Sequence, residues 1–178
     1  MELNPLTALS PIDGRYARQT DALRDIFSEC AFMNARVRVE VEWLISLSEA
    51  GFAELPHLSD HGKAFLRGLA DNFSLADCEA IKEIEKTTNH DVKAVEYWIK
   101  NQVAHDEELK SASEFVHFSC TSEDINNTSH AIMLKRGREA LADYLQQIHD
   151  TIAGFAHQWA EIPMLSRTHG QTASPTTV

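Results

Sequence analysis

The residues from about 124 to 160 constrain the fold most, because their apolar side chains repeat with the period of a long helix. The spacings are seven, four, three, four and three for Leu134, Leu141, Leu145, Ile148, Ile152 and Phe155, which we call the seam. A heptad pattern of this kind marks the face of a helix that packs against another helix. The predicted helix, ended by Pro163, would be roughly 55 Å long at about 1.5 Å per residue. Such a helix needs other long helices beside it, from the same chain or from partners.

The remaining sequence also predicts helices, so the expected fold class is all-α. The first 20 residues contain two prolines and one glycine and predict an extended arm. A mostly helical pattern then runs from about residue 22 to residue 50, and we expect a short helix capped by Ser59 and a further helix opened by a capping box of Ser74 and Asp77. Residues 37–43 alternate with a period of two, as a strand would, but Val37, Val41 and Leu44 also keep helical spacing, and we expect a helix. We expect an N-terminal helical domain over residues 1–110, with its arm, and the start of an incomplete long-helix bundle over residues 111–178.

Composition narrows the classes of partner. The formal net charge of −11 argues against nonspecific DNA or RNA binding and against anionic membranes, but it leaves room for a small anionic substrate. Cys30, Cys78 and Cys120 lie far apart and form no CxxC pair, so we expect reduced thiols rather than disulfides. The histidines show no metal-ligand spacing. Without a signal peptide or an apolar run of roughly 18 residues, the expected location is the cytoplasm.

Two polar runs at predicted helix starts suggest a site for an anion. Backbone N–H groups and the positive end of the helix dipole favour an anion beside Asn89-His90-Asp91. His90 could orient or protonate a substrate, with Asp91 fixing its tautomer. In the alternative, the run only caps a helix, with Thr88 or Asn89 as the capping residue.

The run Thr121-Ser122-Glu123-Asp124 follows the same logic. Its hydroxyl groups, on Thr121 and Ser122, could bind a carboxylate or a phosphate. Thr121 and Asp124 also have the spacing of a capping box with Asp in place of Glu, so a purely structural role is equally open.

Two further segments lie outside the predicted helices. In the arm, Arg15 could grip a phosphate and Tyr16 could add a hydroxyl donor, although a turn with a solvated arginine and a packed tyrosine is the simpler alternative. After Pro163, His169 carries the residue type suited to general acid or base catalysis. An exposed loop histidine with no role is the alternative there.

The four runs in this order resemble the bacterial type of adenylosuccinate lyase, a family of the fumarase/aspartase superfamily. The resemblance rests on Gly14-Arg15-Tyr16, Thr87–Val92, Cys120–Asn127 and Ser166–Gln171 and extends over essentially the whole chain. It implies an all-helical homotetramer that needs no metal or organic cofactor and builds each active site from three subunits. The implied reaction is β-elimination in purine nucleotide biosynthesis: adenylosuccinate yields AMP and fumarate, and SAICAR yields AICAR and fumarate.

The resemblance also implies roles for individual residues. It makes His169 the general acid, and it lets His90 orient the substrate or stabilise the leaving group. The implied substrate-binding residues are Arg15 and Tyr16 at the nucleotide phosphate, Asn89, His90 and Asp91 in a second segment, and Thr121 and Ser122 at the succinyl carboxylates.

The sequence departs from the family pattern in two places. Thr172 stands where many relatives have proline. The family's loop Gly-Ser-Ser-x-Met-Pro-x-Lys-x-Asn-Pro, which supplies the serine base, is absent from these residues. We therefore expect the N-terminal part of a lyase, inactive by itself. The alternatives are a non-catalytic helical module that associates through its seam, or another superfamily lyase such as argininosuccinate lyase; the Gly-Arg-Tyr and Asn-His-Asp runs favour a nucleotide substrate.

Overall fold

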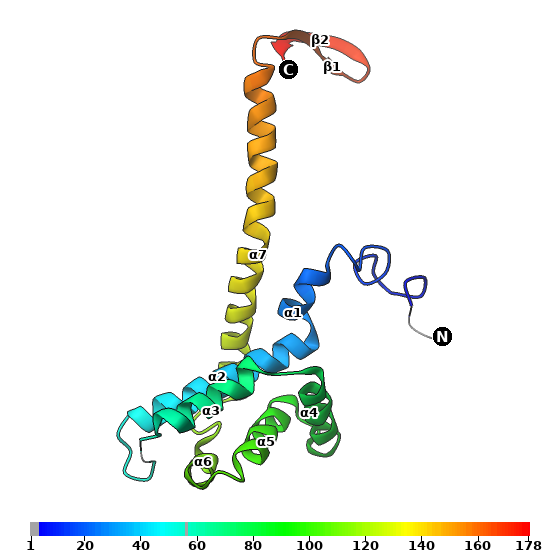
Figure 1. Ribbon diagram of the computed structural model, residues 1–178. Coiled ribbons are helices and arrows are strands. Elements are labelled where there is room, and N and C mark those ends of the chain that lie inside the picture. The colour runs from blue at the N-terminus through cyan, green and yellow to red at the C-terminus, as the bar shows by residue number, and fades with distance from the viewer. Residues whose placement is uncertain (1–3, 56) are drawn as a thin grey trace. The chain divides into compact units, whose positions relative to one another are not determined.

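The computed structural model describes residues 4–55 and 57–178, and helices dominate it (Figure 1). The predicted all-α class is confirmed, with one small two-stranded sheet as the exception. The chain divides into two compact units, Met1–Gly137 and Arg138–Val178, and the division falls within helix α7 (Ser122–Gln158). The domain boundary near residue 110 stays a prediction.

The first unit begins with the arm, in which residues 4–20 form successive turns. A short 3-10 helix η1 (Asp21–Leu23) and α1 (Arg24–Phe27) follow, and α2 (Glu29–Glu49) is the longest helix contained in this unit. We expected one helix from residue 22 to residue 50, and that was wrong. Ser28 is extended, and its side chain accepts a hydrogen bond from the Ala31 N–H, so it ends one helix and caps the next.

Four more helices and a 3-10 turn complete the core with α2, whose Val37, Val41 and Leu44 are buried as the helical spacing predicted. They are α3 (Asp60–Asp71), α4 (Leu75–Thr88), α5 (Asp91–Val103), α6 (Glu107–Ala112) and η2 (Ser113–Phe115). The predicted caps at the starts of α3 and α4 are confirmed, at Ser59 and at the Ser74–Asp77 box. The core of the unit joins these helices through Leu44, Leu66, Ile81, Val95, Ile99 and Leu109.

A disulfide joins α2 to α4, contrary to the expectation of reduced thiols. It links Cys30 to Cys78, whose Cα atoms are 5.6 Å apart, and Cys120 is free. The separation of 48 residues along the chain gave no sign of this pairing, because only the packing of the two helices brings the cysteines within the range that a disulfide needs.

In the second unit, the chain leaves α7 and forms a hairpin that we expected to be loop. Strands β1 (Pro163–Thr168) and β2 (Gln171–Thr177) are antiparallel, and Thr168 pairs with Gln171. The two residues between them, His169 and Gly170, have φ values of 50° and 75°, as the centre of a type I′ turn requires. A His-Gly dipeptide between threonine-rich segments was the missed signal, since glycine and, less readily, histidine adopt this conformation.

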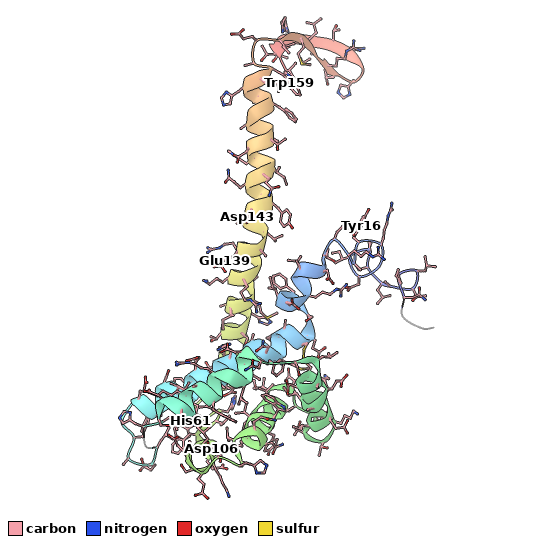
Figure 2. All side chains as sticks on the ribbon, viewed as in Figure 1. Tyr16, His61, Asp106, Glu139, Asp143 and Trp159 are labelled. Atoms are coloured by element: carbon pink, nitrogen blue, oxygen red, sulfur yellow. A yellow bond between two sulfur atoms is a disulfide. The ribbon has the colours of Figure 1, made fainter. Side chains whose placement is uncertain are left out.

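The seam lies exposed on α7. Its five members in the second unit are between 43% and 66% exposed: Leu141, Leu145, Ile148, Ile152 and Phe155. Figure 2 shows side chains projecting from all sides of the helix around Asp143. α7 begins two residues before the predicted start and ends two residues before the predicted end. No helix in the described part of the chain is both long and apolar enough to cross a membrane.

Candidate functional site

His90 is the residue that starts α5. Its backbone is extended, and its Nδ1 accepts a hydrogen bond from the Lys93 N–H at 3.2 Å. Asn89 adopts the left-handed conformation, with φ of 51°, and its N–H bonds to the Glu85 carbonyl to end α4. The expectation that Thr88 or Asn89 caps α5 was therefore wrong. Asparagine tolerates the left-handed region, so the chain turns from one helix into the next within two residues and leaves the histidine at the helix start.

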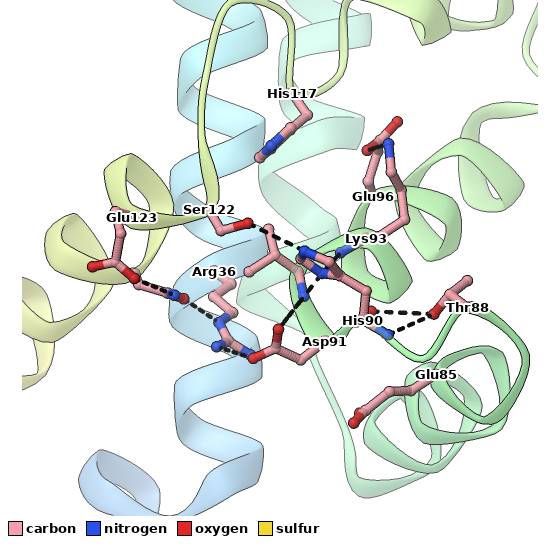
Figure 3. Close-up of polar contacts among 12 residues, drawn as sticks. Arg36, Glu85, Thr88, His90, Asp91, Lys93, Glu96, His117, Ser122 and Glu123 are labelled. Carbon is pink, nitrogen blue, oxygen red and sulfur yellow. Dashed lines mark hydrogen bonds and ion pairs between the residues drawn. The ribbon is translucent and has the colours of Figure 1, made fainter.

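The start of α7 has the predicted capping-box spacing. The backbone N–H and the hydroxyl of Thr121 donate to Asp124 Oδ2 at 2.8 and 2.9 Å. These two hydrogen bonds hold the pKa of the Asp124 carboxyl below its usual value. The Ser122 hydroxyl stays outside the box and lies 3.5 Å from His90 Nε2. The structure thus brings two of the four predicted runs together, at the N-terminal ends of α5 and α7 (Figure 3).

Arg36, which the sequence analysis missed, ties this cluster together. Its guanidinium reaches Asp91 Oδ2 at 2.6 Å and Asn126 Oδ1 at 2.9 Å, and it stacks over the Phe32 ring at 3.9 Å. One buried side chain of α2 therefore holds the first turns of α5 and α7 (Figure 3).

The partner of Asp91 is therefore Arg36 rather than His90. The Asp91 Oδ1 atom lies 3.7 Å from His90 Nδ1, which already accepts from the Lys93 N–H. The expectation that Asp91 fixes the tautomer of His90 was wrong. Burial acts to raise the pKa of Asp91, but the Val92 N–H bond and the charge of Arg36 together hold that pKa below its ordinary value.

A second missed pair is Glu40 and His117. The Glu40 side chain is fully buried on α2, and its Oε1 lies 2.5 Å from His117 Nδ1. Burial raises the pKa of Glu40, and the hydrogen bond to His117 offsets this in part. The usable signal was on α2: Arg36 and Glu40 sit four residues apart among the buried apolar residues of that helix, where a charged side chain needs a partner.

Positive charge lies beside the cluster. The ammonium group of Lys93 is partly exposed and contacts Glu96 at 2.6 Å, and that hydrogen bond raises the pKa of Lys93. Together with Arg36 and the positive dipole ends of two helices, it favours an anionic ligand. A cavity of about 390 Å³ adjoins the Arg36–Asp91 pair, and its other lining residues are Phe27, Ser28, Glu29, Phe32, His130 and Met133. A larger cavity, of about 500 Å³, is lined by Asp124 of the second run but by none of the residues predicted to bind substrate.

The other predicted residues lie outside this cluster. Arg15 and Tyr16 lie in the arm, where the guanidinium is 5.4 Å from the centre of the tyrosine ring. Gly14 lets two parts of the arm backbone approach closely, since an added Cβ would lie 2.8 Å from the Pro5 carbonyl oxygen. His169 is exposed at the tip of the hairpin in the second unit. Within the described residues, no group of three or more His, Cys, Asp or Glu side chains could hold a metal ion.

Comparison with known sequences extends this account. The profile of the family described as Lyase matches residues 14–178. Proteins named adenylosuccinate lyase match the whole chain, at 53% identity in Vibrio cholerae, 54% in Haemophilus influenzae and 52% in Escherichia coli. The chain spans about 40% of the length of each of these relatives.

Solved structures show the same fold. A fumarate lyase from Mesorhizobium matches 88% of this chain and 34% of its own, with a TM-score of 0.68 and 20% identity. The β-carboxy-cis,cis-muconate cycloisomerase of Acinetobacter calcoaceticus matches 89% of this chain and 35% of its own, with a TM-score of 0.69 and 18% identity. At this level of identity, these similarities show only that the fold is shared. With the family match over residues 14–178 and the relatives named above, the chain belongs to the lyase family and is similar throughout to adenylosuccinate lyases.

Proposed function

We propose that this chain forms part of an adenylosuccinate lyase of purine nucleotide biosynthesis, which cleaves adenylosuccinate to AMP and fumarate and SAICAR to AICAR and fumarate. The observation that carries the proposal is the contact between His90 and Ser122, which joins two helix starts into one anion-favouring cluster. The names of the relatives, at about half identity over the whole chain, support the choice of substrate.

The cluster fits the demands of β-elimination from a succinyl group. A base removes a proton next to a carboxylate, and negative charge builds up on that carboxylate. Hydroxyl groups aimed at the growing charge would stabilise it. In our proposal Ser122 donates its hydroxyl to this charge, and the Thr121 hydroxyl moves from Asp124 Oδ2 to the substrate when it binds. His90 orients the departing side of the substrate, with Asn89 and Asp91 shaping the turn that holds it.

The remaining roles come from residues outside the cluster. We propose that Arg15 and Tyr16 bind the nucleotide phosphate and that His169 is the general acid. We propose, as the resemblance to the family implies, a site shared among subunits of a cytoplasmic homotetramer. The chain by itself should have negligible activity.

A chimera tests the proposal. Residues 1–178 are joined to the part of the Vibrio cholerae relative that this chain does not match, and fumarate release is followed by absorbance with adenylosuccinate and with argininosuccinate. Turnover of adenylosuccinate by the chimera and none by the chain alone is the expected result. A folded chimera that releases fumarate only from argininosuccinate would replace the proposed substrate. Turnover by the purified chain alone would contradict the proposed need for residues beyond it.

The exposed seam favours a second function, association through a helical module. An apolar face of this size on a lone helix is costly in water, so it indicates helix partners. Sedimentation of the chain should show oligomers, whereas a monomer at high concentration would count against this role. Replacing Leu145 and Ile152 by glutamine should shift the oligomers toward monomer. His149→Gln, on the same helix and outside the seam, is the control and should leave the oligomers unchanged.

A further inference from the structure

We propose that Glu40 is a positioning residue that fixes His117 in the Nδ1–H tautomer, so that His117 and His90 present ring nitrogens of opposite hydrogen-bonding character at the starts of α5 and α7. The inference rests on the hydrogen-bond partners of the two rings. It depends on the proposed function only in treating this face of the cluster as the face that meets substrate.

The tautomer of His117 follows from its buried partner. Nδ1 lies 2.5 Å from Glu40 Oε1, and an ionised carboxylate can only accept a hydrogen bond. Nδ1 therefore carries the hydrogen, and in the neutral ring Nε2 is left as an acceptor. Carboxylates fix the tautomer and orientation of histidines in this way in metal sites and catalytic triads.

The buried environment of Glu40 supports its role in positioning the His117 ring. Its side chain is fully buried on α2, and within the described residues its second oxygen, Oε2, has no hydrogen-bond partner. An unpaired buried oxygen is costly, and an apolar residue would pack at this position without that cost. The carboxylate contacts a histidine that still reaches the surface, with 18% of its side chain exposed.

The tautomer of His90 is the opposite one. Its Nδ1 accepts from the Lys93 N–H, which can only donate, so the hydrogen of the neutral ring lies on Nε2. That Nε2 faces the Ser122 hydroxyl at 3.5 Å. In the neutral rings, Nε2 of His90 is therefore a hydrogen-bond donor and Nε2 of His117 is an acceptor.

The two rings belong to one neighbourhood. His117 precedes the Thr121–Asp124 box, at the start of α7, by four residues. Figure 3 shows His117, Ser122 and His90 grouped beside α2. A substrate that meets this face therefore finds a donor and an acceptor fixed before it arrives, and a ligand with both an anionic oxygen and an N–H or O–H group matches them.

The tautomers can be measured directly by NMR. The 178-residue chain, labelled with ¹⁵N, is recorded with long-range ¹H–¹⁵N correlations of the imidazole rings over a pH titration, and the variants H117Q and H90Q assign the two rings. For the neutral rings we expect a protonated Nδ1 in His117 and a protonated Nε2 in His90. An Nε2–H tautomer of His117 would mean that Glu40 holds the proton and donates it, and would overturn the proposal.

Two variants isolate the role of the carboxylate. In E40Q the amide oxygen can still accept from Nδ1, so the Nδ1–H tautomer should persist. In E40L the Nδ1–H tautomer of His117 should be replaced by the Nε2–H tautomer that free imidazole groups favour. His90 is the internal control, since its partner is a backbone N–H and its signals should not change. An unchanged His117 tautomer in folded E40L would overturn the proposal, and the wild-type measurement decides the question if E40L does not fold. Because no turnover is needed, failure here is distinct from failure of the lyase assay.

Discussion

Replacing Arg36 by methionine tests the central connection of the cluster. Methionine keeps much of the length of the side chain and its contact with Phe32, but it removes the bonds to Asp91 and Asn126. Hydrogen bonds of charged groups contribute about 1.5–3 kcal/mol, and the stacked guanidinium adds about 1 kcal/mol. Losing one partner of a fully buried pair costs about 3–5 kcal/mol, but the Asp91 side chain is half exposed and water can solvate it. We expect a loss of about 2–3 kcal/mol in the free energy of unfolding.

Urea unfolding followed by far-UV circular dichroism measures this loss. The matched control is Lys86→Met, which removes an exposed ion pair to Glu83 within α4 and should change the free energy of unfolding by less than about 0.5 kcal/mol. Equal midpoints for the two variants would refute the assignment of Arg36 as the connection between helices.

The pH dependence of the same loss gives a second check. The pKa of Asp91 is held below its ordinary value in the folded chain, so its contribution to stability is fully present above the unfolded pKa, about 4. The contribution disappears as the pH falls through the lower folded pKa. The difference between wild type and Arg36→Met should therefore narrow below about pH 4. A difference that stays constant from pH 7 to pH 3 would contradict the role given to the ion pair.

Two other predictions concern thiols and glycines. Titration of the unfolded chain without reductant should find one free thiol, and three after reduction, because Cys30 and Cys78 are joined; three thiols at the outset would contradict the disulfide. Gly137→Ala should lower the free energy of unfolding by about 1 kcal/mol, because the added methyl would displace the half-exposed Phe27 ring and the gain in helix propensity offsets part of that cost. Gly154→Ala, on the same helix with open space around it, should instead raise helix stability by about 0.5–1 kcal/mol, and thermal unfolding that moves both variants in one direction would count against this packing.

The sequence predicted helices and their caps well where the pattern involves residues only a few positions apart. The caps at Ser59 and Ser74 and the helical state of residues 37–43 follow from short-range spacing, and the structure has them. The break at Ser28 was missed because the apolar period continues across it. The hairpin was missed because polar, threonine-rich residues after Pro163 were taken for a loop.

The candidate site was only partly predictable, for a physical reason. Capping patterns in the sequence mark the residues at helix starts, and these patterns identified His90 and Ser122 as candidate site residues. Arg36 and Glu40 belong to the middle of α2, where only tertiary contacts with Asp91 and His117 explain them. No spacing within one helix could reveal partners that lie 55 and 77 residues away.

The most direct test of the central claim is the value of kcat/KM for adenylosuccinate in the chimera carrying His90→Gln. A residue that orients or protonates substrate typically contributes about 10²–10⁴ in rate, so we expect a loss of at least about 100-fold. His149→Gln, at an exposed position on α7, is the control and should leave the rate unchanged. A folded His90→Gln chimera with wild-type kcat/KM would show that the cluster at the starts of α5 and α7 is not the substrate site.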